Sequence, residues 1–517
     1  HSIPVIVDAF FKGYKNYDTL LAYEAVKITA MRKDPIPWGD PRVVPKQDLR
    51  IQAQYLNNLS FIPADTLEKT VSNALEFAID DWCVAQMAKA FNKKDDYDYF
   101  TKRSNLYKMY FDSITQFMRG RNANNTWRTP FDPAYSSHLA FDYVEGNAWQ
   151  YTWLVPHDPK GLIGLFGSDD AFTKKLDQLF TTSASMGEEA SPDISGLIGM
   201  YAQGNEPNHH IPYLYAFAGE QWKTAWRVRQ IVDTFYTSKT DGLCGNEDCG
   251  QMSAWYVLSA LGFYPVTPGT TDFIIGTPLF PSATILLENG KSFTINAKNV
   301  SNKNFYIQSA YLNNAAHNKS YLSYFDIAKG GQLNFNMTNK PSDFGKTGMP
   351  VTAIRDNLIV LNPVIDGGPI SFRGTKKIFI YSNQPDVSFY YTTDGSTPSA
   401  LSKKVTGDFY VDSSVTIKAI AIHKNGDKSF VTTARYTKMP HNWTIKLNTP
   451  YEQQYDGNGE NGLIDNIRGE VDWRKGNWQG YQKTDLDAVI DLQEVKQVSK
   501  ITIGLLQDSG PWIIMPK

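Results

Sequence analysis

The apolar residues of this chain change their spacing near Pro265, and that change divides the fold into two kinds of structure. Before it, apolar side chains recur at intervals of three and four, which is the period of amphipathic helices. The segments with this period are Asp18–Arg32, Ala64–Phe91, Asp95–Met118 and Asp170–Phe180. After it, short runs alternate apolar and polar residues between Gly, Asn and Pro turns, as β-strands do. The sequence therefore predicts a multidomain α plus β protein with a helical part first.

The chain has 517 residues, which exceeds what one hydrophobic core organises, so we expect several domains. Four are predicted: a helical domain over 1–264, a β-sandwich over 265–365, a smaller β-sandwich over 366–440 and a partial β-sandwich over 441–517. The helical part has long loops rich in Trp, Pro, Gly and Asp, such as RGRNANNTWRTPFDP. Such loops favour a helical toroid, which gathers them at one end into a site, over a short-loop bundle.

Composition excludes several classes of function. The 53 acidic and 51 basic residues nearly cancel, and no basic run is present, so the chain does not look like a nucleic-acid-binding protein. No stretch of about 18 apolar residues occurs, so no membrane span is predicted. The three cysteines, Cys83, Cys244 and Cys249, form no four-ligand zinc pattern, and the last two are equally compatible with a disulfide or with free thiols.

One loop combines glycines with polar residues at the start of a predicted helix. In the segment DGLCGNEDCGQMSAWYVLSALG, Asn246, Glu247 and Asp248 lie between glycines, and the apolar run that follows ends at Gly262. Glycines let the backbone fold tightly and approach a ligand closely. Polar residues in a loop on the edge of a rigid helix are typical of functional sites.

A second cluster surrounds Glu145 in the string YVEGNAWQYTWLVPHD. A single Glu in a loop is usually only solvated. Here it is followed by Gly146, Trp149 and other aromatic residues. Loss of hydration among indole rings raises the pKa of a carboxyl group, which is what a general acid working near neutral pH requires.

Two further clusters each leave two interpretations open. Gln203, Asn205 and Glu206 offer oxygen ligands of the kind that Ca²⁺ takes, but the same residues suit the capped start of a helix. The neighbouring His209 and His210 are a poor zinc pair because adjacent side chains point in different directions. The acidic pair in FAIDDWCVAQMAKA either lines a pocket beside Trp82 or forms a solvated helix face; its members are Asp80 and Asp81.

These clusters together indicate a chemistry. Hydrolysis of a glycosidic bond needs two carboxyl groups and aromatic platforms for the sugar. One acid protonates the leaving oxygen, and the other attacks or activates water. The helical part contains neither a GxSxG nucleophile motif nor a phosphate-binding loop. Sequence spacing does not distinguish the attacking carboxylate from the water-activating one.

The chain closely resembles the α-mannosidases of glycoside hydrolase family 92 over about residues 1 to 345. The matching strings are HSIPVIVDAFFKG, DDWCVAQMAKA, RTPFDP, YVEGNAWQYTWLVPHD, GNEPNHHIPYLYAFAG and GLCGNEDCGQMSAWYVLSALGFYPV. The resemblance implies a calcium-dependent exo-acting enzyme that releases mannose with inversion. It also implies an (α/α)6 catalytic barrel packed against β-sandwich structure. Members carry an N-terminal β-sandwich and the first barrel helices before the HSIP string, so we expect this chain to be N-terminally incomplete.

The resemblance also implies roles for particular residues. Glu145 matches the general acid and Asp248 the general base, with Asn246 as a helper that orients water and Glu247 as a rival base. The implied calcium ligands are Asn205, Glu206 and, less directly, Gln203. The predicted substrate-binding residues are Trp149, His209, His210, Glu247, Asp80 and Asp81. The implied substrates are terminal mannosides of mannose-rich glycans, with α-1,2 linkages favoured, and the implied location is secreted or periplasmic in a bacterium.

The C-terminal part carries two shorter resemblances. The segment around YTTDGSTPS is similar to the small β domain at the C-terminus of bacterial hexosaminidases. The strings LIDN, NWQGYQKTDLDAVIDL and PWIIMP look like the start of a discoidin-like carbohydrate-binding sandwich. Two alternatives to a mannosidase remain open: a non-catalytic carbohydrate-binding fragment of a larger glycosidase, and another (α/α)6 enzyme such as a phosphorylase or lyase.

Overall fold

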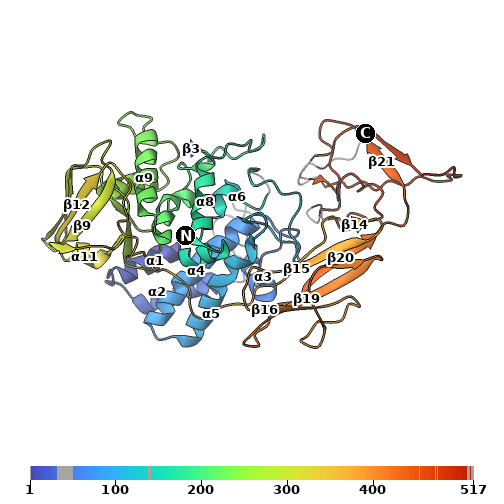
Figure 1. Ribbon diagram of the computed structural model, residues 1–517, viewed down its shortest axis with the longest axis horizontal. Coiled ribbons are helices and arrows are strands. Elements are labelled where there is room, and N and C mark those ends of the chain that lie inside the picture. The colour runs from blue at the N-terminus through green and yellow to red at the C-terminus, as the bar shows by residue number, and fades with distance from the viewer. Residues whose placement is uncertain are drawn as a thin grey trace. The chain divides into compact units, whose positions relative to one another are not determined.

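A computed structural model describes residues 2–31, 51–137, 141–452, 455–471, 473, 476–508 and 513 of the chain (Figure 1). It divides into two compact units, which are described separately. The first comprises His1–Asn57, Val71–Met118 and Pro133–Leu358, and the second comprises Asn58–Thr70, Arg119–Asp132 and Ile359–Lys517. The boundary therefore does not follow the sequence, because two segments of the helical part belong to the second unit. The division into four domains stays a prediction.

The long helices come first in the chain, as the apolar period predicts. They are α1 (Ser2–Phe11), α2 (Thr19–Met31), α3 (Ile51–Leu59), α4 (Thr70–Ala90) and α5 (Lys94–Ser104). A shared core of buried side chains joins α1, α2, α4 and α5. Helix α4 is buried on nearly all sides, so it is apolar around most of its circumference rather than on one face.

Two helix boundaries differ from the predicted ones. The helix predicted from Ala64 begins at Thr70, because the preceding residues form a turn on the carbonyl of Pro63 and Lys69 adopts a positive φ of 57°. The helix predicted to reach Met118 ends at Ser104 and continues as the 3₁₀ helix η1 (Asn105–Tyr110). The end of the segment predicted over Asp18–Arg32 lies outside the described residues.

Short elements separated by long connections fill the rest of the helical part. They are β1 (Phe111–Asp112), β2 (Phe117–Met118), α6 (Ala148–Tyr151), α7 (Pro159–Leu165), α8 (Asp169–Leu179), β3 (Leu197–Ile198), β4 (Tyr201–Ala202), η2 (Glu206–Asn208), η3 (Ile211–Ala218), α9 (Gln221–Phe235) and α10 (Gln251–Leu261). The polar clusters singled out from the sequence lie mainly at the ends of these short elements.

The first unit ends in a β-sandwich, as the alternating pattern after Pro265 predicts. Its strands are β5 (Phe263–Tyr264), β6 (Asp272–Ile275), β7 (Ser282–Leu286), β8 (Ser292–Lys298), β9 (Tyr306–Leu312), β10 (Ala315–Ala316), β11 (Tyr321–Ser323) and β12 (Gly331–Thr338), with the short helix α11 (Tyr324–Ala328). They form a five-stranded sheet in the order β10-β9-β12-β8-β7 and a three-stranded sheet in the order β11-β6-β5. Apolar side chains from both sheets share one core, so the sheets pack face to face.

The second unit contains another pair of sheets. Its strands are β13 (Val364–Asp366), β14 (Ser371–Phe372), β15 (Lys376–Tyr381), β16 (Val387–Thr392), β17 (Lys403–Lys404), β18 (Phe409–Val411), β19 (Val415–His423) and β20 (Thr432–Lys438). They form sheets in the orders β13-β15-β18 and β14-β20-β19-β16-β17 around a common core. The loop over residues 119–132 is tied into this unit, since the Asn125 side chain donates to the Pro363 carbonyl at 3.1 Å.

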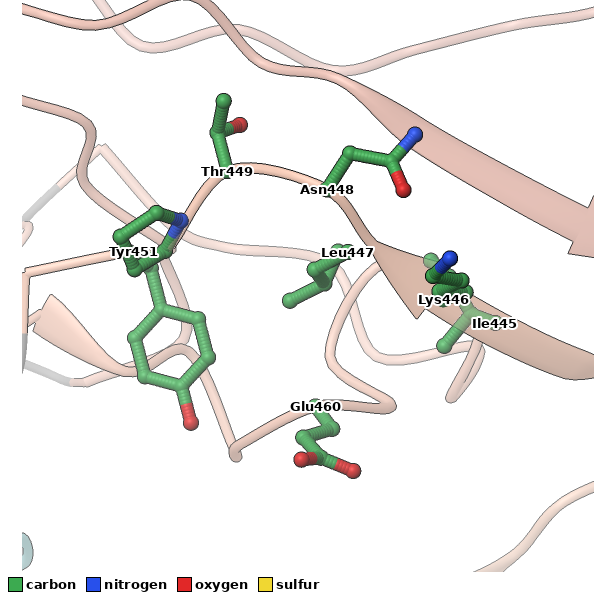
Figure 2. Close-up of a pocket in the computed structure, with 8 residues that line it drawn as sticks. Ile445, Lys446, Leu447, Asn448, Thr449, Tyr451 and Glu460 are labelled. Atoms are coloured by element: carbon green, nitrogen blue, oxygen red, sulfur yellow. The ribbon is translucent and has the colours of Figure 1, made fainter.

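The C-terminal segment forms a two-stranded ribbon of β21 (Thr444–Leu447) and β22 (Ala488–Asp491). A cavity of about 550 Å³ lies against β21 and the chain that follows it. Figure 2 shows Leu447, Tyr451 and Glu460 around this cavity. All of its lining residues lie at positions 445–460, so none of the predicted site residues lines it.

Candidate active site

Glu145 lies in a turn that leads directly into α6. Asn147 caps this helix, and its side chain and that of Gln150 form a reciprocal capping box. Glu145 has a φ of +48°, in the left-handed region that residues with a Cβ rarely adopt. Gly146 follows because a Cβ there would lie 2.6 Å from the ring of Tyr151. The sequence EGNAWQY is therefore a sharp turn followed by a capped helix start.

The loop GNEP supplies the second part of the site. Asn205 precedes the short helix η2, and its Oδ1 accepts a hydrogen bond from the backbone N–H of Glu206 at 3.1 Å. Its Nδ2 donates to the backbone carbonyl of Glu145 at 2.9 Å. One asparagine side chain thus joins the loop that carries Glu206 to the turn that carries Glu145.

The loop over residues 242–250 supplies the third part, and a glycine contact brings it to the second. A Cβ on Gly245 would lie 2.5 Å from the Cα of Gly204, so the two backbones touch where neither residue has a side chain. The loop then turns through Asp248, Cys249 and Gly250, which all have positive φ angles. Asp248 and Cys249 carry a Cβ, so their left-handed conformations store backbone strain in this loop.

Three carboxyl groups from these loops share one electrostatic environment. Burial raises the pKa of Glu206 most, and the negative charges of Asp248 and Glu145 raise it further. Among the residues the structure describes, none of the three carboxyl groups forms an ion pair with Lys or Arg. The fold therefore brings Glu145, Glu206 and Asp248 together.

The other two polar residues of the third loop have partners of their own. Both carboxylate oxygens of Glu247 accept hydrogen bonds at 3.1 Å from Ser253, one from its N–H and one from its hydroxyl. Glu247 therefore satisfies one of the free N–H groups in the first turn of α10, that of Ser253. Asn246 is exposed and its Nδ2 lies 3.4 Å from Asp193 Oδ1. Of the two acids in NED, Asp248 is the one whose negative charge acts on Glu206.

His209 and His210 are buried and bind protein carbonyls. His209 Nε2 donates to the Gln203 carbonyl at 2.8 Å, and His210 Nε2 donates to the Trp153 carbonyl at 2.7 Å. Burial lowers the pKa of each histidine to about 4, so both are neutral at pH 7. Their ring nitrogens therefore hold the 203–210 segment in place, and a substrate role for them stays a prediction.

The remaining predicted substrate residues lie in well-packed surroundings. Asp81 is fully buried, and its two oxygens accept hydrogen bonds from Arg103 Nε and Nη2 at 2.6 and 2.5 Å. Asp81 therefore forms a buried ion pair with Arg103, and a substrate role for it stays a prediction. Asp80 is 5% exposed. Trp149 is also largely buried, and its ring packs edge-on against Phe117 with centroids 4.7 Å apart.

The side-chain oxygens in and near the predicted calcium site differ in whether they already accept a hydrogen bond. Gln203 is fully buried; its Oε1 accepts from the Tyr201 hydroxyl and its Nε2 donates to the Tyr236 hydroxyl at 2.8 Å. A cation would have to share that oxygen. By contrast, Asn208 Oδ1 is buried and finds no hydrogen-bond donor among the described residues. A buried unpaired acceptor is costly unless a cation or water satisfies it.

The donor set of this loop fits a hard cation better than a transition metal. No group of three or more His, Cys, Asp or Glu side chains arranged to hold a metal occurs in the part of the chain that the structure describes. Ca²⁺ accepts amide and backbone oxygens together with a carboxylate, and the loop offers Glu206 and Asn208 Oδ1. A cation would also relieve the repulsion among the three carboxyl groups.

Comparison with known proteins gives the family. The model of the glycosyl hydrolase family 92 catalytic domain matches residues 1–339. The chain belongs to glycosyl hydrolase family 92. A second model, that of the chitobiase/beta-hexosaminidase C-terminal domain, matches residues 366–433. Both matches confirm resemblances visible in the sequence.

Solved structures of this family are similar to the chain. A GH92 alpha-mannosidase from Bacteroides thetaiotaomicron in complex with mannoimidazole is 40% identical, with a TM-score of 0.61, over 68% of this chain and 45% of that one. A GH92 inverting mannosidase from the same organism is 32% identical, with a TM-score of 0.60, over 68% and 48%. An uncharacterized secreted glycosidase from Arthroderma benhamiae is 26% identical over 66% of this chain. The GH92 chain spans 45% of the length of that relative.

Sequence reasoning left three residues of this GH92 site without a role. Tyr151 and Ser72 both contact the turn of Glu145, and Asn208 carries the unpaired oxygen. The tyrosine stands in a recognised motif, but nothing in its spacing tells that its hydroxyl returns to a carbonyl seven residues earlier.

Among the described residues, no helix has both the length and the apolar content to span a membrane.

Proposed function

We propose that this GH92 chain is the catalytic part of an exo-acting, calcium-dependent α-mannosidase that works with inversion. The observation that carries the proposal is the meeting of Glu145, Glu206 and Asp248 on three loops whose strings are those of the family. Relatives that are mannosidases and one that is an inverting mannosidase support the reaction class. Their structures also support the proposal that the helices belong to an (α/α)6 barrel.

The proposed mechanism uses one carboxyl group on each side of the scissile bond. Glu145 donates its proton to the glycosidic oxygen as the bond from that oxygen to the anomeric carbon breaks. A water molecule attacks the anomeric carbon from the opposite face and gives its proton to the Asp248 carboxylate. Asn246 is an exposed neighbour in the same loop and orients this water. The product is mannose of inverted anomeric configuration.

The proposed calcium site lies in the GNEP loop. Glu206 and Asn208 Oδ1 would hold the ion, with Asn205 and Gln203 contributing if they share oxygens that already accept hydrogen bonds. Bound there, Ca²⁺ would supply positive charge that binds sugar hydroxyls and favours distortion of the ring toward the transition state. The same charge would offset the repulsion that the charges of Asp248 and Glu145 exert on the Glu206 carboxylate.

The proposed substrates are terminal α-mannosides of mannose-rich glycans, with α-1,2 linkages favoured. Because such glycans lie outside cells and a relative is named as a secreted glycosidase, we propose that the protein is secreted. The competing function is carbohydrate binding without turnover, in which the acidic residues and Trp149 only hold sugar. A phosphorylase or lyase of the same fold class would be recognised by a sugar phosphate or an unsaturated product.

A digest of α-1,2-mannobiose with and without chelator tests this function. Proton NMR during the digest is expected to show β-mannose first, because inversion of an α-mannoside gives the β anomer. Excess chelator is expected to stop turnover, and added Ca²⁺ to restore it. Initial α-mannose or full activity in chelator would contradict inversion or the calcium role respectively. Mannose binding without any turnover would favour the carbohydrate-binding alternative.

Substitution of Gly245 tests whether the contact between the two loops positions Asp248. In Gly245→Ala the new Cβ would meet the Gly204 backbone at 2.5 Å, and backbone cannot move aside as a flexible side chain can. We expect the loops to separate and kcat/KM for mannobiose to fall about 10²-fold. Gly164→Ala is the matched control, because a Cβ there meets nothing within 4 Å. Equal activities of the two variants would show that the contact does not matter.

A further inference from the structure

Three side chains from separate elements bind the backbone of the turn that carries Glu145. Ser72 on α4 accepts a hydrogen bond from the Val144 N–H at 2.7 Å. The Tyr151 hydroxyl on α6 donates to the Val144 carbonyl at 2.6 Å. Asn205 donates to the Glu145 carbonyl at 2.9 Å. All three hydrogen bonds are made to the backbone of Val144 or Glu145, the two residues that set the direction of the Glu145 side chain.

This turn needs outside support because its conformation is unfavourable in isolation. Glu145 has a Cβ and a positive φ, so a free peptide of this sequence would leave the left-handed region. Neighbouring groups must therefore hold it. If the φ of Glu145 relaxed by a few tens of degrees, its carboxyl group would move away from the position that it has in the folded protein.

Tyr151 makes the most complete contact with the turn. Its side chain is 2% exposed, and its ring occupies the space beside Gly146, where any Cβ would clash. Its hydroxyl binds the Val144 carbonyl while Ser72 binds the N–H of the same residue, so two of the three supports meet at Val144. The ring thus packs beside Gly146 while the hydroxyl binds the Val144 carbonyl. Removal of the hydroxyl alone therefore tests the hydrogen bond and keeps the packing of the ring.

We propose that Tyr151 is a positioning residue for the general acid: its hydroxyl, bound to the Val144 carbonyl, holds Glu145 where it reaches the leaving oxygen. This inference rests on the proposed role of Glu145. It predicts that loss of the hydroxyl harms proton donation specifically. Ser72, which accepts a hydrogen bond from the N–H of the same Val144, acts with it.

The test compares substrates that differ in their need for a proton. The glycosidic oxygen of α-1,2-mannobiose must be protonated to leave, whereas 2,4-dinitrophenolate leaves without a proton. Tyr151→Phe is expected to lower kcat/KM for mannobiose about tenfold, the effect of one lost hydrogen bond to a buried carbonyl. It is expected to change kcat/KM for 2,4-dinitrophenyl α-mannoside less than about twofold.

Two further variants keep the result interpretable. Glu145→Gln must show the same selectivity more strongly than Tyr151→Phe, that is, a larger loss of kcat/KM for mannobiose than for 2,4-dinitrophenyl α-mannoside, since it removes the proton itself. Tyr215→Phe is the matched control; this fully buried tyrosine donates its hydroxyl to Asp177 at 2.7 Å, away from the turn. Tyr215→Phe is expected to change kcat/KM for the two substrates by the same factor. Ser72→Ala is expected to repeat the selectivity of Tyr151→Phe, and it decides the matter if Tyr151→Phe does not fold.

The outcomes separate failure of this inference from failure of the proposed function. If Glu145→Gln is selective and both Tyr151→Phe and Ser72→Ala slow the two substrates equally, the supports are merely structural and the inference is wrong. If Glu145→Gln is not selective, Glu145 is not the general acid, and both the proposed function and the inference fail. Selectivity in all three variants supports the inference.

Discussion

Replacement of Asp248 by Asn is expected to lower kcat/KM for α-1,2-mannobiose by about 10²–10⁴-fold, the usual contribution of a general base. The amide keeps the size of the side chain but cannot accept the proton of the attacking water. Asp248 is exposed and the amide preserves its shape, so we expect the melting temperature to change little. Activity and thermal unfolding of the same preparation check both expectations.

Glu247→Gln is the comparison that decides between the two acids of the loop. Glu247 binds Ser253 at the start of α10, so its replacement is expected to weaken the helix start more than the chemistry. If Glu247→Gln instead removes turnover and Asp248→Asn does not, the rival assignment is correct. Asp248→Ala with added azide gives a second readout, because azide attacking in place of water would yield a β-mannosyl azide.

Replacement of Arg103 by Leu is expected to destabilise the first unit by about 3–5 kcal/mol, because it leaves the buried Asp81 carboxylate without its partner. The Arg103 guanidinium binds both Asp81 oxygens and also donates to the Ala30 carbonyl at 2.8 Å. Burial opposes the charge of Arg103, whereas the Asp81 carboxylate raises its pKa. The free energy of unfolding in urea measures the effect.

Two other variants test the assignment of this ion pair. Lys94→Ala breaks the exposed pair of Lys94 with Asp98 and is expected to leave stability unchanged within error. The double variant Asp81→Leu/Arg103→Leu is expected to recover much of the lost stability, since it buries no unpaired charge. A single Arg103→Leu variant as stable as the parent would show that Asp81 finds another partner.

Several features of the fold follow from local patterns in the sequence. The apolar period predicts α4 and α8, and the alternation after Pro265 predicts the strands that share the sandwich core. Local patterns misplace the start of α4, because Lys69 takes a left-handed conformation that no propensity demands. Helix ends depend on turns and on contacts with the rest of the unit, so periodicity locates them poorly.

The candidate site likewise has features that the sequence reveals and features that it does not. The strings around Glu145, Glu206 and Asp248 are recognisable in the sequence, whereas the choice between Glu247 and Asp248 is not. The hydrogen bonds between Glu247 and Ser253 in the first turn of α10 favour Asp248 as the proposed base. Likewise, only the structure shows that Asp81, one of the two acids beside Trp82, binds Arg103 on the next helix. Neither apolar periodicity nor a motif string reveals these hydrogen-bond partners.

The sequence by itself determined the family, the order of helical and β structure, and the three loops that carry the acids, because periodicity and motif strings are local properties. Only the tertiary structure decided that Gly204 touches Gly245, that the charges of Asp248 and Glu145 act on Glu206, and that Tyr151, Ser72 and Asn205 hold the Glu145 turn. Most of these contacts join residues that are far apart along the chain. They exist because packing of the whole unit stabilises left-handed turns and clustered carboxyl groups that no isolated segment would adopt.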